Sequence, residues 1–386
     1  MARLLFLHFP DKIKGKSPAA DGATLNTLTG ESGIMATTIK EIARLAGVSI
    51  GTVDRALHNR GRVDPAVAQR IQNIAQELAY KPNSIAQGLS ARSRRLRVAV
   101  VFHRKNLDPY FQDVLQGIEI CRGEAAEASV EVDLLYGEDF SVESQLELLG
   151  QVEREQYNAL IVVPINDEAV IARINALCQG GMPVILLTNL IEGCDFLSFI
   201  GCDYTLSGEI AAGLLNMIHP MPGKLLYLSP SFHMLGHVLR LNGLRQQLNR
   251  FYPQIELCSV CELTGNDRRD YRITKDALHQ NPDTDMVVCP GAAGRGHMEA
   301  LEEFARGRKI RIVSYDDSHS TEQYIRDRFI TATLVQHPVQ QGYLAVKTAV
   351  NRLLDPRNFT AEKFQYLPTG VYFLENLSNI HSRYRI

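Results

Sequence analysis

The segment IKEIARLAGVSIGTVDR, residues 39–55, has the spacing of two short helices joined by a tight turn. Apolar residues stand three and four positions apart in its first half, as one face of a helix requires, at Ile39, Ile42, Ala43 and Ala46. Gly47 then suits the left-handed backbone that ends many helices. We therefore expect one helix that ends at this glycine and a second helix over residues 50–57.

Residues that commonly cap helices flank both segments, and a third helix start follows them. Thr38 with Glu41 forms a capping-box pattern, Ser49 is suited to cap the second helix, and Asp64-Pro65 is a typical helix start. Two short helices around a glycine-containing turn are typical of the DNA-binding helix-turn-helix. The pattern alone also fits a small three-helix bundle without a nucleic-acid role.

The charges of the chain are unevenly distributed. The 386 residues carry a net charge of −2, but residues 35–97 hold 11 Lys and Arg against 4 Asp and Glu, a balance of +7. Residues 98–386 hold 26 Lys and Arg against 36 Asp and Glu, a balance of −10. The basic head indicates a polyanionic partner, with nucleic acid as the leading candidate, and the acidic body is expected to have another role.

Three strings in the basic head carry a family resemblance: IKEIARLAGVS (39–49), Thr52-Val53-x-Arg55 and Tyr80-Lys-Pro-Asn83. Together they resemble the head of the lactose-repressor (LacI/GalR) family nearly end to end. The resemblance implies a homodimer on a pseudo-palindromic double-stranded DNA operator, with residues 50–58 as the recognition helix in the major groove. The DNA-binding candidates are Thr38, Ser49, Ile50, Gly51, Thr52, Asp54, Arg55, His58, Tyr80, Asn83, Ala86 and Leu89.

The recognition segment departs from the best-known members of the family. Gly51 has no side chain with which to read a base, and Ile50 offers only an apolar contact, for example to a thymine methyl. Asp54 is suited to accept from a cytosine amino group, or it is a solvated charge paired with His58. Direct readout is therefore expected to depend on Arg55 and His58.

Residues 82–89 (PNSIAQGL) match the hinge helix of the family. In the family, two such helices enter the minor groove and a leucine from each wedges a base step, which bends the DNA. Leu89 is the matching leucine, and a core leucine is the alternative. Arginines follow it that are expected to add phosphate contacts, namely Arg92, Arg94, Arg95 and Arg97.

From residue 97 onward, predicted strands alternate with predicted helices. Strands are expected at 97–102, 158–164, 182–188, 224–228, 254–261, 285–289 and 311–315, and helices include 110–122, 142–155 and 168–179. Such alternation implies parallel sheets, and the series repeats after residue 203. The predicted fold class is α/β: an all-α helix-turn-helix head followed by a two-lobed, Rossmann-like body that binds ligands at the carboxyl ends of its strands.

The body also resembles the periplasmic sugar-binding-protein fold that this repressor family carries, over residues 98 to about 380. The resemblance implies three crossings of the chain between the lobes, which we place near Asp203, Thr331 and Gln365. Lobe 1 is then expected over about 98–202 and 332–365, and lobe 2 over about 203–331 and 366–380. The expected ligand is a small sugar or sugar derivative that acts as an effector between the lobes.

Several residues stand where the family builds its sugar site or where a predicted strand ends. Tyr110 and Phe111 are expected to stack on a sugar face, unless they only begin a core helix. Arg240 matches the family's cleft arginine, a fork donor to paired hydroxyls, unless it is an exposed helix charge. Arg104 would suit a carboxylated or phosphorylated ligand, and a solvated loop role is the alternative for the strand-end residues. The effector-binding candidates are His103, Arg104, Asp108, Tyr110, Phe111, Thr188, Asn189, Arg240, Asp316 and Gln336.

The loop after the predicted strand 285–289 departs from the family pattern. Many relatives have an Asn-Asp pair there, whereas this chain has PGAAG at 290–294. The loop therefore lacks side-chain hydrogen-bonding groups, and we do not expect the galactoside of the best-known member as effector.

Other classes of protein are disfavoured by the composition and the motifs. No apolar run approaches the roughly 20 residues of a membrane span, and seven cysteines fit reduced thiols in a cytoplasm better than a disulfide scaffold. Cys258 and Cys261 lack the second pair that a zinc site needs, and neither a Walker loop nor a nucleophile elbow is present. We expect no metal, no cofactor and no enzymatic activity. The main alternative function is an exported sugar-binding receptor of a transport system.

The expected domain organisation starts with residues 1–34 as a disordered extension or the product of a mis-assigned start, with Met35 as the true initiator. The helix-turn-helix domain is expected at 35–82, the hinge helix and linker at 83–97, and the effector-binding domain at 98–386. The sequence therefore predicts a cytoplasmic, homodimeric transcription regulator, a repressor unless shown otherwise, whose operator affinity a sugar-like effector controls.

Overall fold

The computed structural model describes residues 39–57, 63–77, 95–104, 109–230, 232, 234–290 and 294–379. The chain divides into two units, Met1–Pro82 and Asn83–Ile386. Within the described ranges, no helix combines the length and the apolar character that a bilayer span requires.

The described part of the first unit is a bundle of three helices, α1 (Ile39–Ala46), α2 (Ile50–Leu57) and α3 (Pro65–Glu77). One side chain from each helix is fully buried in its core: Ile42, Val53 and Ile71. These positions belong to the apolar faces that the helical spacing defines. The small core therefore fixes the angle between α1 and α2, and with it the exposed face of α2.

The turn between α1 and α2 has the geometry expected at Gly47, whose φ is +65°. The Gly47 amide donates to the Arg44 carbonyl at 3.3 Å, and the Val48 amide donates to the Ala43 carbonyl at 3.0 Å. This pairing is the Schellman arrangement that satisfies the last carbonyls of a helix. Arg70 of α3 adds a 2.7 Å hydrogen bond to the Ala46 carbonyl, which ties the turn to the third helix.

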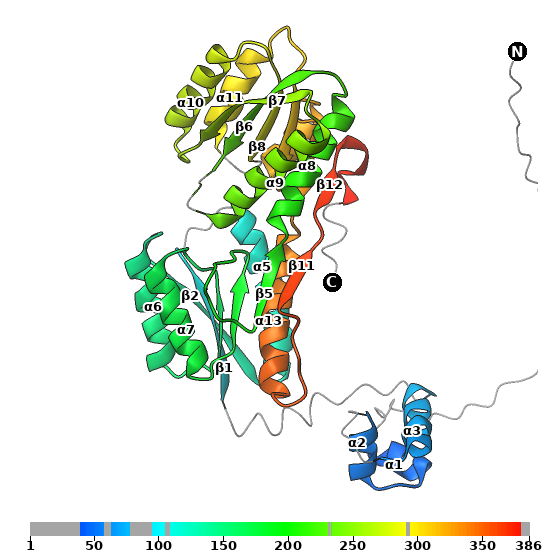
Figure 1. The fold of residues 1–386 in the computed structure, drawn as a ribbon. Coiled ribbons are helices and arrows are strands. Elements are labelled where there is room, and N and C mark those ends of the chain that lie inside the picture. Colours follow the sequence, from blue (N-terminus) through cyan, green and yellow to red (C-terminus); the bar gives the residue numbers. More distant parts are fainter. Residues whose placement is uncertain are drawn as a thin grey trace, which may run out of the picture. The chain divides into compact units, whose positions relative to one another are not determined.

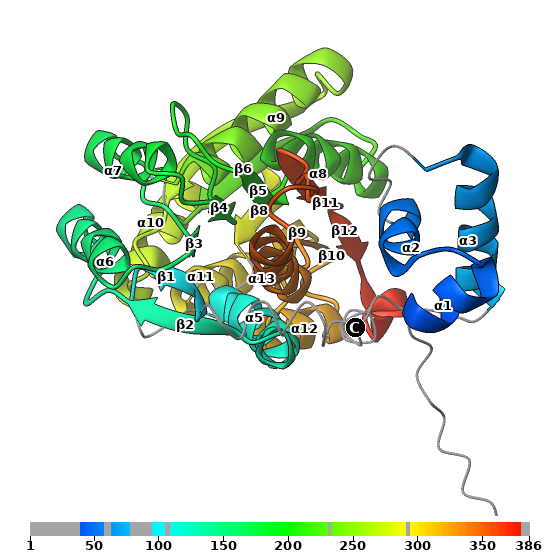
Figure 2. The same cartoon turned by 90° about the horizontal axis from the view of Figure 1, so that it is seen from below.

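The first sheet of the second unit is parallel throughout, with strand order β11-β5-β4-β3-β1-β2. Its strands are β1 (Leu96–Phe102), β2 (Val130–Tyr136), β3 (Ala159–Val162), β4 (Val184–Leu187), β5 (Ser198–Cys202) and β11 (Phe364–Leu367). Helices α5 (Pro109–Glu127) and α13 (Pro338–Leu354) cover one face, and α6 (Val142–Arg154) and α7 (Glu168–Gln179) cover the other (Figure 2). This sheet and its helices form lobe 1.

The second sheet has strand order β12-β10-β9-β8-β6-β7 and is parallel except for the β10–β12 pair. Its strands are β6 (Gly223–Ser229), β7 (Ile255–Glu262), β8 (Thr284–Pro290), β9 (Arg311–Tyr315), β10 (Ala332–Val335) and β12 (Gly370–Tyr372). Helices α8 (Tyr204–Ile218) and α9 (Leu235–Phe251) cover one face, and α10 (Asp267–Gln280), α11 (Arg295–Phe304) and α12 (His319–Arg326) cover the other. This sheet and its helices form lobe 2 (Figure 1).

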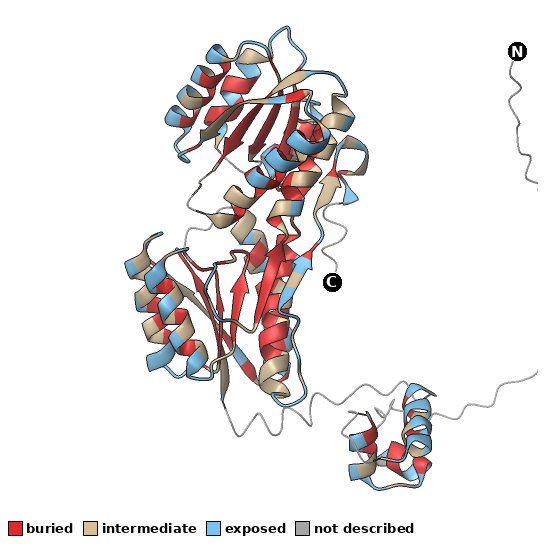
Figure 3. Cartoon of the chain, in the orientation of Figure 1, coloured by how far each residue is buried: buried red, intermediate tan, exposed pale blue. Residues whose placement is uncertain are grey.

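Both lobes bury their central strands between two helical layers, so the strands are red and the outward helix faces pale blue in Figure 3. Strands covered on both faces read as continuous apolar runs, which is why the sequence pattern located six of the seven predicted strands. The seventh, β7, is an edge strand of intermediate burial. The predicted α/β class, with a helical head and a two-lobed body, is confirmed.

Two of the three crossings between the lobes lie later than the sequence placed them. The first crossing is at Asp203, whose side chain caps α8 by accepting from the Leu206 amide at 3.0 Å. The second was expected near Thr331, but β10 still pairs with β9 of lobe 2, so the chain crosses at 336–337. The third was expected near Gln365, but β11 pairs with β5 of lobe 1, so the chain crosses at 368–369. Both shifts follow from four-residue strands whose sheet no local pattern reveals.

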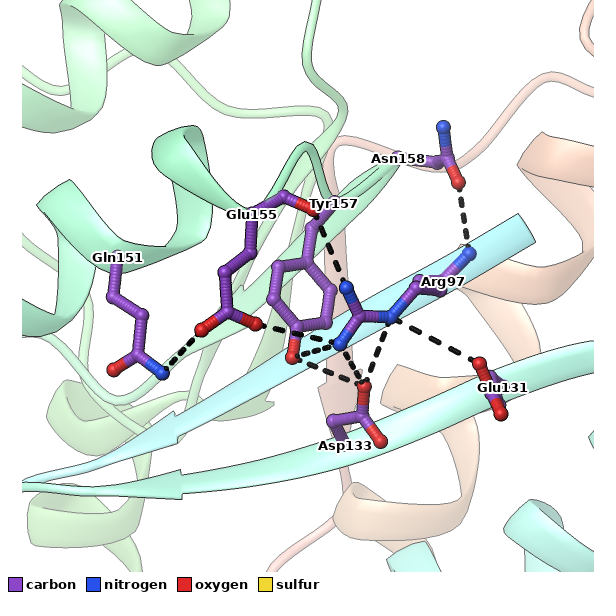
Figure 4. Close-up of polar contacts among 7 residues, drawn as sticks. All are labelled: Arg97, Glu131, Asp133, Gln151, Glu155, Tyr157 and Asn158. Carbon is purple, nitrogen blue, oxygen red and sulfur yellow. Dashed lines mark hydrogen bonds and ion pairs between the residues drawn. The ribbon is translucent and has the colours of Figure 1, made fainter. Parts of the chain in front are cut away.

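Arg97, at the start of β1, is held inside lobe 1 by a polar network (Figure 4). Its Nη2 donates to Asp133 Oδ2 at 2.8 Å and to the Tyr157 hydroxyl at 2.7 Å, and the guanidinium carbon lies 4.0 Å from the centre of the Tyr157 ring. Glu155 lies 3.5 Å away as a further ionic partner. The expected phosphate contact of Arg97 is therefore wrong, because its guanidinium is already paired; Arg92 and Arg94 lie outside the described residues.

Candidate functional site

The start of α2 is fixed by the cap that the sequence predicted. Ser49 Oγ accepts from the Thr52 amide at 3.2 Å and pairs with Thr52 Oγ1 at 2.9 Å. Asp64 caps α3 in the same way, accepting from the amides of Ala66 at 2.9 Å and Val67 at 3.2 Å. These caps confirm the predicted helix starts and hold α2 in a fixed register.

The exposed face of α2 combines an apolar and a cationic side chain. Ile50 is 49% exposed, Gly51 and Arg55 are also exposed, and Thr52 is half-buried. Arg55 Nε donates to the Gly51 carbonyl at 3.0 Å, so its guanidinium lies along the helix. This face is suited to the major groove of DNA, where Ile50 can contact a thymine methyl group and Arg55 can contact a nearby phosphate.

Several DNA-contact predictions fall outside what the structure describes. They concern Thr38, His58, Tyr80, Asn83, Ala86 and Leu89, together with the side chain of Asp54. For these residues the sequence predictions stand as made.

A cavity of about 450 Å³ lies between the two lobes of the second unit. Residues one or two positions beyond the ends of β1, β4, β7, β9 and β10 line it, as expected for parallel sheets that bind ligands at the carboxyl ends of their strands. The predicted site residues that it brings together are Arg104, Tyr110, Phe111, Thr188, Asn189, Arg240, Asp316 and Gln336. We call this space the interlobe cavity.

Two of these residues have a left-handed backbone at the end of a strand. Thr188 follows β4 with φ of +59°, and Asp316 follows β9 with φ of +65°. Such a conformation costs a non-glycine residue about 1–3 kcal/mol and is found preferentially at functional sites. Each is held by the next strand, since the Thr188 amide donates to Ile200 at 2.8 Å and the Asp316 amide to Leu334 at 2.8 Å.

Arg240 is a buried cation in the wall of the interlobe cavity. Only 3% of the residue is exposed, and its guanidinium carbon lies 4.9 Å from the Tyr204 ring centre and 4.4 Å from that of Tyr315. Its Nε and Nη2 are buried and have no hydrogen-bond partner among the residues that the structure describes. Burial acts to lower the pKa of Arg240, but the Asp316 carboxylate and the tyrosines raise it above its usual value, so the group stays charged.

A chain of side-chain amides connects the carboxylate of lobe 2 to the aromatic wall of lobe 1. Gln336 Nε2 donates to Asp316 Oδ1 at 2.6 Å, and Gln341 Nε2 donates to the Gln336 carbonyl at 2.8 Å. The Tyr110 hydroxyl in turn donates to Gln341 Oε1 at 3.2 Å. The second crossing therefore joins groups that line the cavity from both lobes.

His103 does not line the cavity. His103 is 6% exposed and packs edge-on against Phe111 and Phe140, with ring centres 6.0 and 4.5 Å apart. Burial, and then the charge of Arg104, lower the pKa of His103 to about 4, so it is a neutral part of the wall behind Phe111. Asp108 lies outside the described residues.

The sequence reading missed several residues that line the cavity. Tyr204 donates to the Thr188 carbonyl across the first crossing, and Thr264 and Gly265 follow the end of β7. His237 stands one helical turn before Arg240, and burial, and then the charge of Arg240, lower its pKa to about 3. The rule that strand ends form the site would have found Thr264 and Gly265. Tyr204 and His237 need the geometry of α8 and α9, where Gly208 lies against the Arg240 carbonyl and brings the helices together.

Comparison with known proteins matches both parts of the chain. Residues 38–83 match the family of bacterial regulatory proteins called the lacI family, and residues 98–355 match a periplasmic binding protein domain. The chain is 27% identical over 289 residues to the ribose operon repressor of Bacillus subtilis (strain 168), covering 72% of this chain and 81% of that protein. It is 23% identical over 257 residues to catabolite control protein A of Staphylococcus epidermidis, covering 66% and 74%.

Solved structures share the fold of the second unit. A glucose-galactose binding protein from Geobacillus stearothermophilus superposes with a TM-score of 0.66 at 18% identity, over 74% of this chain and 99% of that one. An arabinose binding protein from the same organism gives a TM-score of 0.62 at 22% identity, over 74% and 98%. The helix-turn-helix unit, the two-lobed unit and the matches that cover both lead to one assignment: the chain belongs to the lacI family of bacterial regulatory proteins, and its second unit is a periplasmic binding protein domain.

Proposed function

We propose that this chain is a sequence-specific DNA-binding transcription regulator, a repressor, whose operator affinity is controlled by a small sugar-like effector. The observation that carries the proposal is the presence of two different binding elements in one chain. A basic helix-turn-helix unit exposes α2, and a separate acidic unit holds an interlobe cavity lined by polar and aromatic side chains. Relatives named as repressors of the ribose and sucrose operons support the same function.

The proposed DNA-bound form is a homodimer on a pseudo-palindromic operator. Each α2 would lie in a major groove, with Ile50 and Arg55 towards the bases and phosphates. Leu89 and the other predicted hinge residues would enter the minor groove between the half-sites. The balance of +7 over residues 35–97 supports this, because phosphate neutralisation supplies much of the affinity for DNA.

Control by the effector requires that it bind two states of the protein with different affinity. The interlobe cavity is suited to this, because its lining comes from both lobes and changes when the lobes close. Coupling between two such sites typically amounts to about 1–3 kcal/mol. The proposed effector contacts are the predicted residues that line the cavity, above all Arg240, Asp316 and Gln336.

Two other functions receive less support. A transport receptor shares the two-lobed fold but has no use for the lacI-type head at 38–83. An enzyme would need paired reacting groups in the cavity, and the relatives are named as regulators. A regulator of this kind acts where chromosomal DNA is, and we therefore propose the cytoplasm as its location.

Selection of DNA fragments tests the proposal directly. The immobilised full chain is incubated with sheared genomic DNA of the organism that encodes it, and the retained fragments are sequenced. We expect a small set of fragments that share an inverted repeat. The control is Ile50→Glu, which places a negative charge on the exposed face of α2 without touching the core. Equal retention by wild type and control, with no shared repeat, would contradict the proposal.

A further inference from the structure

The N-terminal end of α9 opens into the interlobe cavity. Met234, Gly236 and His237 line the cavity from its first turn. The N-cap residue is Met234, which offers no side-chain oxygen where Ser, Thr, Asp or Asn usually accept from the first-turn amides. A helix end of this kind favours negative charge, because its amides and its dipole point towards the ligand.

Arg240 is a second and independent indication of an anion at the same place. It lies one turn further along α9 and is 97% buried, and within the described part of the chain its Nε and Nη2 have no hydrogen-bond partner. Its raised pKa keeps it protonated. A buried cation with unpaired donors is costly unless a ligand oxygen completes its hydrogen bonds, and an oxyanion does so more strongly than a hydroxyl.

The charges that line the cavity leave a positive excess. Two arginines, Arg104 and Arg240, face one carboxylate, Asp316, among the described lining residues, and Gln336 already donates to that carboxylate. His237 adds no charge near neutral pH, since its pKa is about 3. The nearby N-terminus of α11 is compensated by Asp267, which accepts from the Gly296 amide at 3.3 Å. Among the described residues, no side chain caps the N-terminus of α9 itself, although the Glu262 carboxylate accepts from the Phe232 amide at 2.9 Å, three residues before the helix begins.

We propose that the effector is an anionic carbohydrate, with a phosphate or carboxylate group bound between the α9 N-terminus with Arg240 in lobe 2 and Arg104 in lobe 1. This inference rests on the proposed function, in that it takes the interlobe cavity as the effector site. It adds the chemical class of the effector and a reason for lobe closure. Arg104 is exposed at the end of β1, and an anion on lobe 2 would draw it inward.

Calorimetric titration of the full chain with matched ligands tests the inference. The probes are glucose, glucose 6-phosphate and glucuronate, then ribose and ribose 5-phosphate, and inorganic phosphate as competitor. We expect at least one anionic sugar to bind tenfold or more tightly than its neutral partner, with competition by inorganic phosphate. Whether glucose 6-phosphate or glucuronate binds more tightly shows whether the site prefers a phosphate or a carboxylate group.

Two variants separate the charge from the rest of the site. Arg104→Gln should reduce the preference for the anionic sugar, taken as the ratio of the two dissociation constants, by about tenfold or more. Arg173→Gln is the control, because Arg173 pairs with Glu153 at 2.6 Å on the surface of the same lobe, and it should leave both affinities unchanged.

The inference is overturned if a neutral sugar binds as tightly as its anionic partner, or if neither the charged sugars nor inorganic phosphate bind. Operator binding is measured on the same preparation, so that failure of the anionic-effector inference can be distinguished from failure of the proposed function. A neutral sugar that changes operator affinity would leave the proposed function intact and remove only the anionic effector. If the wild type bound no DNA sequence specifically, the proposed function itself would be contradicted.

Discussion

The side-chain amide of Gln336 donates a 2.6 Å hydrogen bond to Oδ1 of Asp316, and both residues line the interlobe cavity. Gln336 stands at the second crossing between the lobes, and Asp316 ends β9 with a left-handed backbone. The carboxylate is thus oriented by the segment that must bend when the lobes move. A ligand that contacts Asp316 therefore contacts a residue that is hydrogen-bonded to the crossing.

Replacing Gln336 with Ala should weaken effector binding by about tenfold or more. A hydrogen bond to a charged group contributes about 1.5–3 kcal/mol, and its loss removes the contact that orients the carboxylate from the crossing. Titration of the identified effector measures the change. Gln365→Ala is the matched control, because Gln365 donates to the Ser198 and Thr348 hydroxyls in lobe 1, at 2.9 and 3.2 Å. Equal losses in both variants would show that the hydrogen bond to Asp316 has no special role.

Replacing Gly208 with Ala should disturb the site from behind. Its added Cβ would overlap the Arg240 carbonyl, so α8 and α9 must separate and Arg240 must move. We expect a loss of about 1–3 kcal/mol in the free energy of unfolding together with weaker effector binding. Gly213→Ala on the same helix is the control, since its Cβ would lie 3.7 Å from the Tyr252 hydroxyl, an ordinary contact. Gly213→Ala should be neutral or stabilise by about 0.5–1 kcal/mol; urea unfolding of both variants decides.

The protein should lose stability between pH 6.5 and pH 4 because His103 is buried and neutral. Burial, and then Arg104, lower the pKa of His103 to about 4, whereas an unfolded histidine titrates near 6.5. As the pH falls below 6.5, the unfolded chain takes up a proton that the folded chain does not, so the contribution is complete above pH 6.5 and is lost towards pH 4. At pH 5.5 the loss amounts to about 1.4 kcal/mol.

Urea unfolding at pH 7.5 and pH 5.5 checks this, with His103→Leu beside the wild type. The variant should show a difference between the two pH values that is smaller by about 1.4 kcal/mol. His319→Leu at an exposed position of α12 is the control and should behave as the wild type does. An unchanged pH dependence in His103→Leu would mean that this histidine is not the source.

Replacing Leu89 with Ala should weaken specific operator binding and leave effector binding unchanged. The predicted wedge costs unstacking energy and gains contact with bent DNA, so its removal should cost specific affinity tenfold or more while non-specific binding persists. Anisotropy with operator and with scrambled DNA measures both. Unaltered operator affinity would remove Leu89 from the hinge.

The sequence was most informative where local pattern and burial agree. Strands covered on both faces, such as β1 and β3, are continuous apolar runs, and the caps at Ser49 and Asp64 are set by residues two and three positions away. Strand ends also identified Thr188 and Asp316, because the carboxyl edge of a parallel sheet gathers them whatever the rest of the fold does.

The remainder depends on contacts between distant segments. β10 is a four-residue strand, and only its pairing with β9 assigns it to lobe 2. His103 ends a strand like its neighbour Arg104, but Phe111 and Phe140 enclose it and keep it from the cavity. Tyr204 was missed because its role depends on a hydrogen bond to the Thr188 carbonyl, 16 residues away in the sequence. No local pattern encodes these distances.

The most direct test of the account is the operator affinity of the full chain with and without saturating effector, measured by fluorescence anisotropy in wild type and in Arg240→Ala. The account predicts a change of about 5- to 150-fold in the dissociation constant of the wild type. It predicts no change in Arg240→Ala, which should still bind the operator because the head is untouched. An effector that binds the wild type and leaves its operator affinity unaltered would contradict the central claim that the interlobe cavity controls DNA binding.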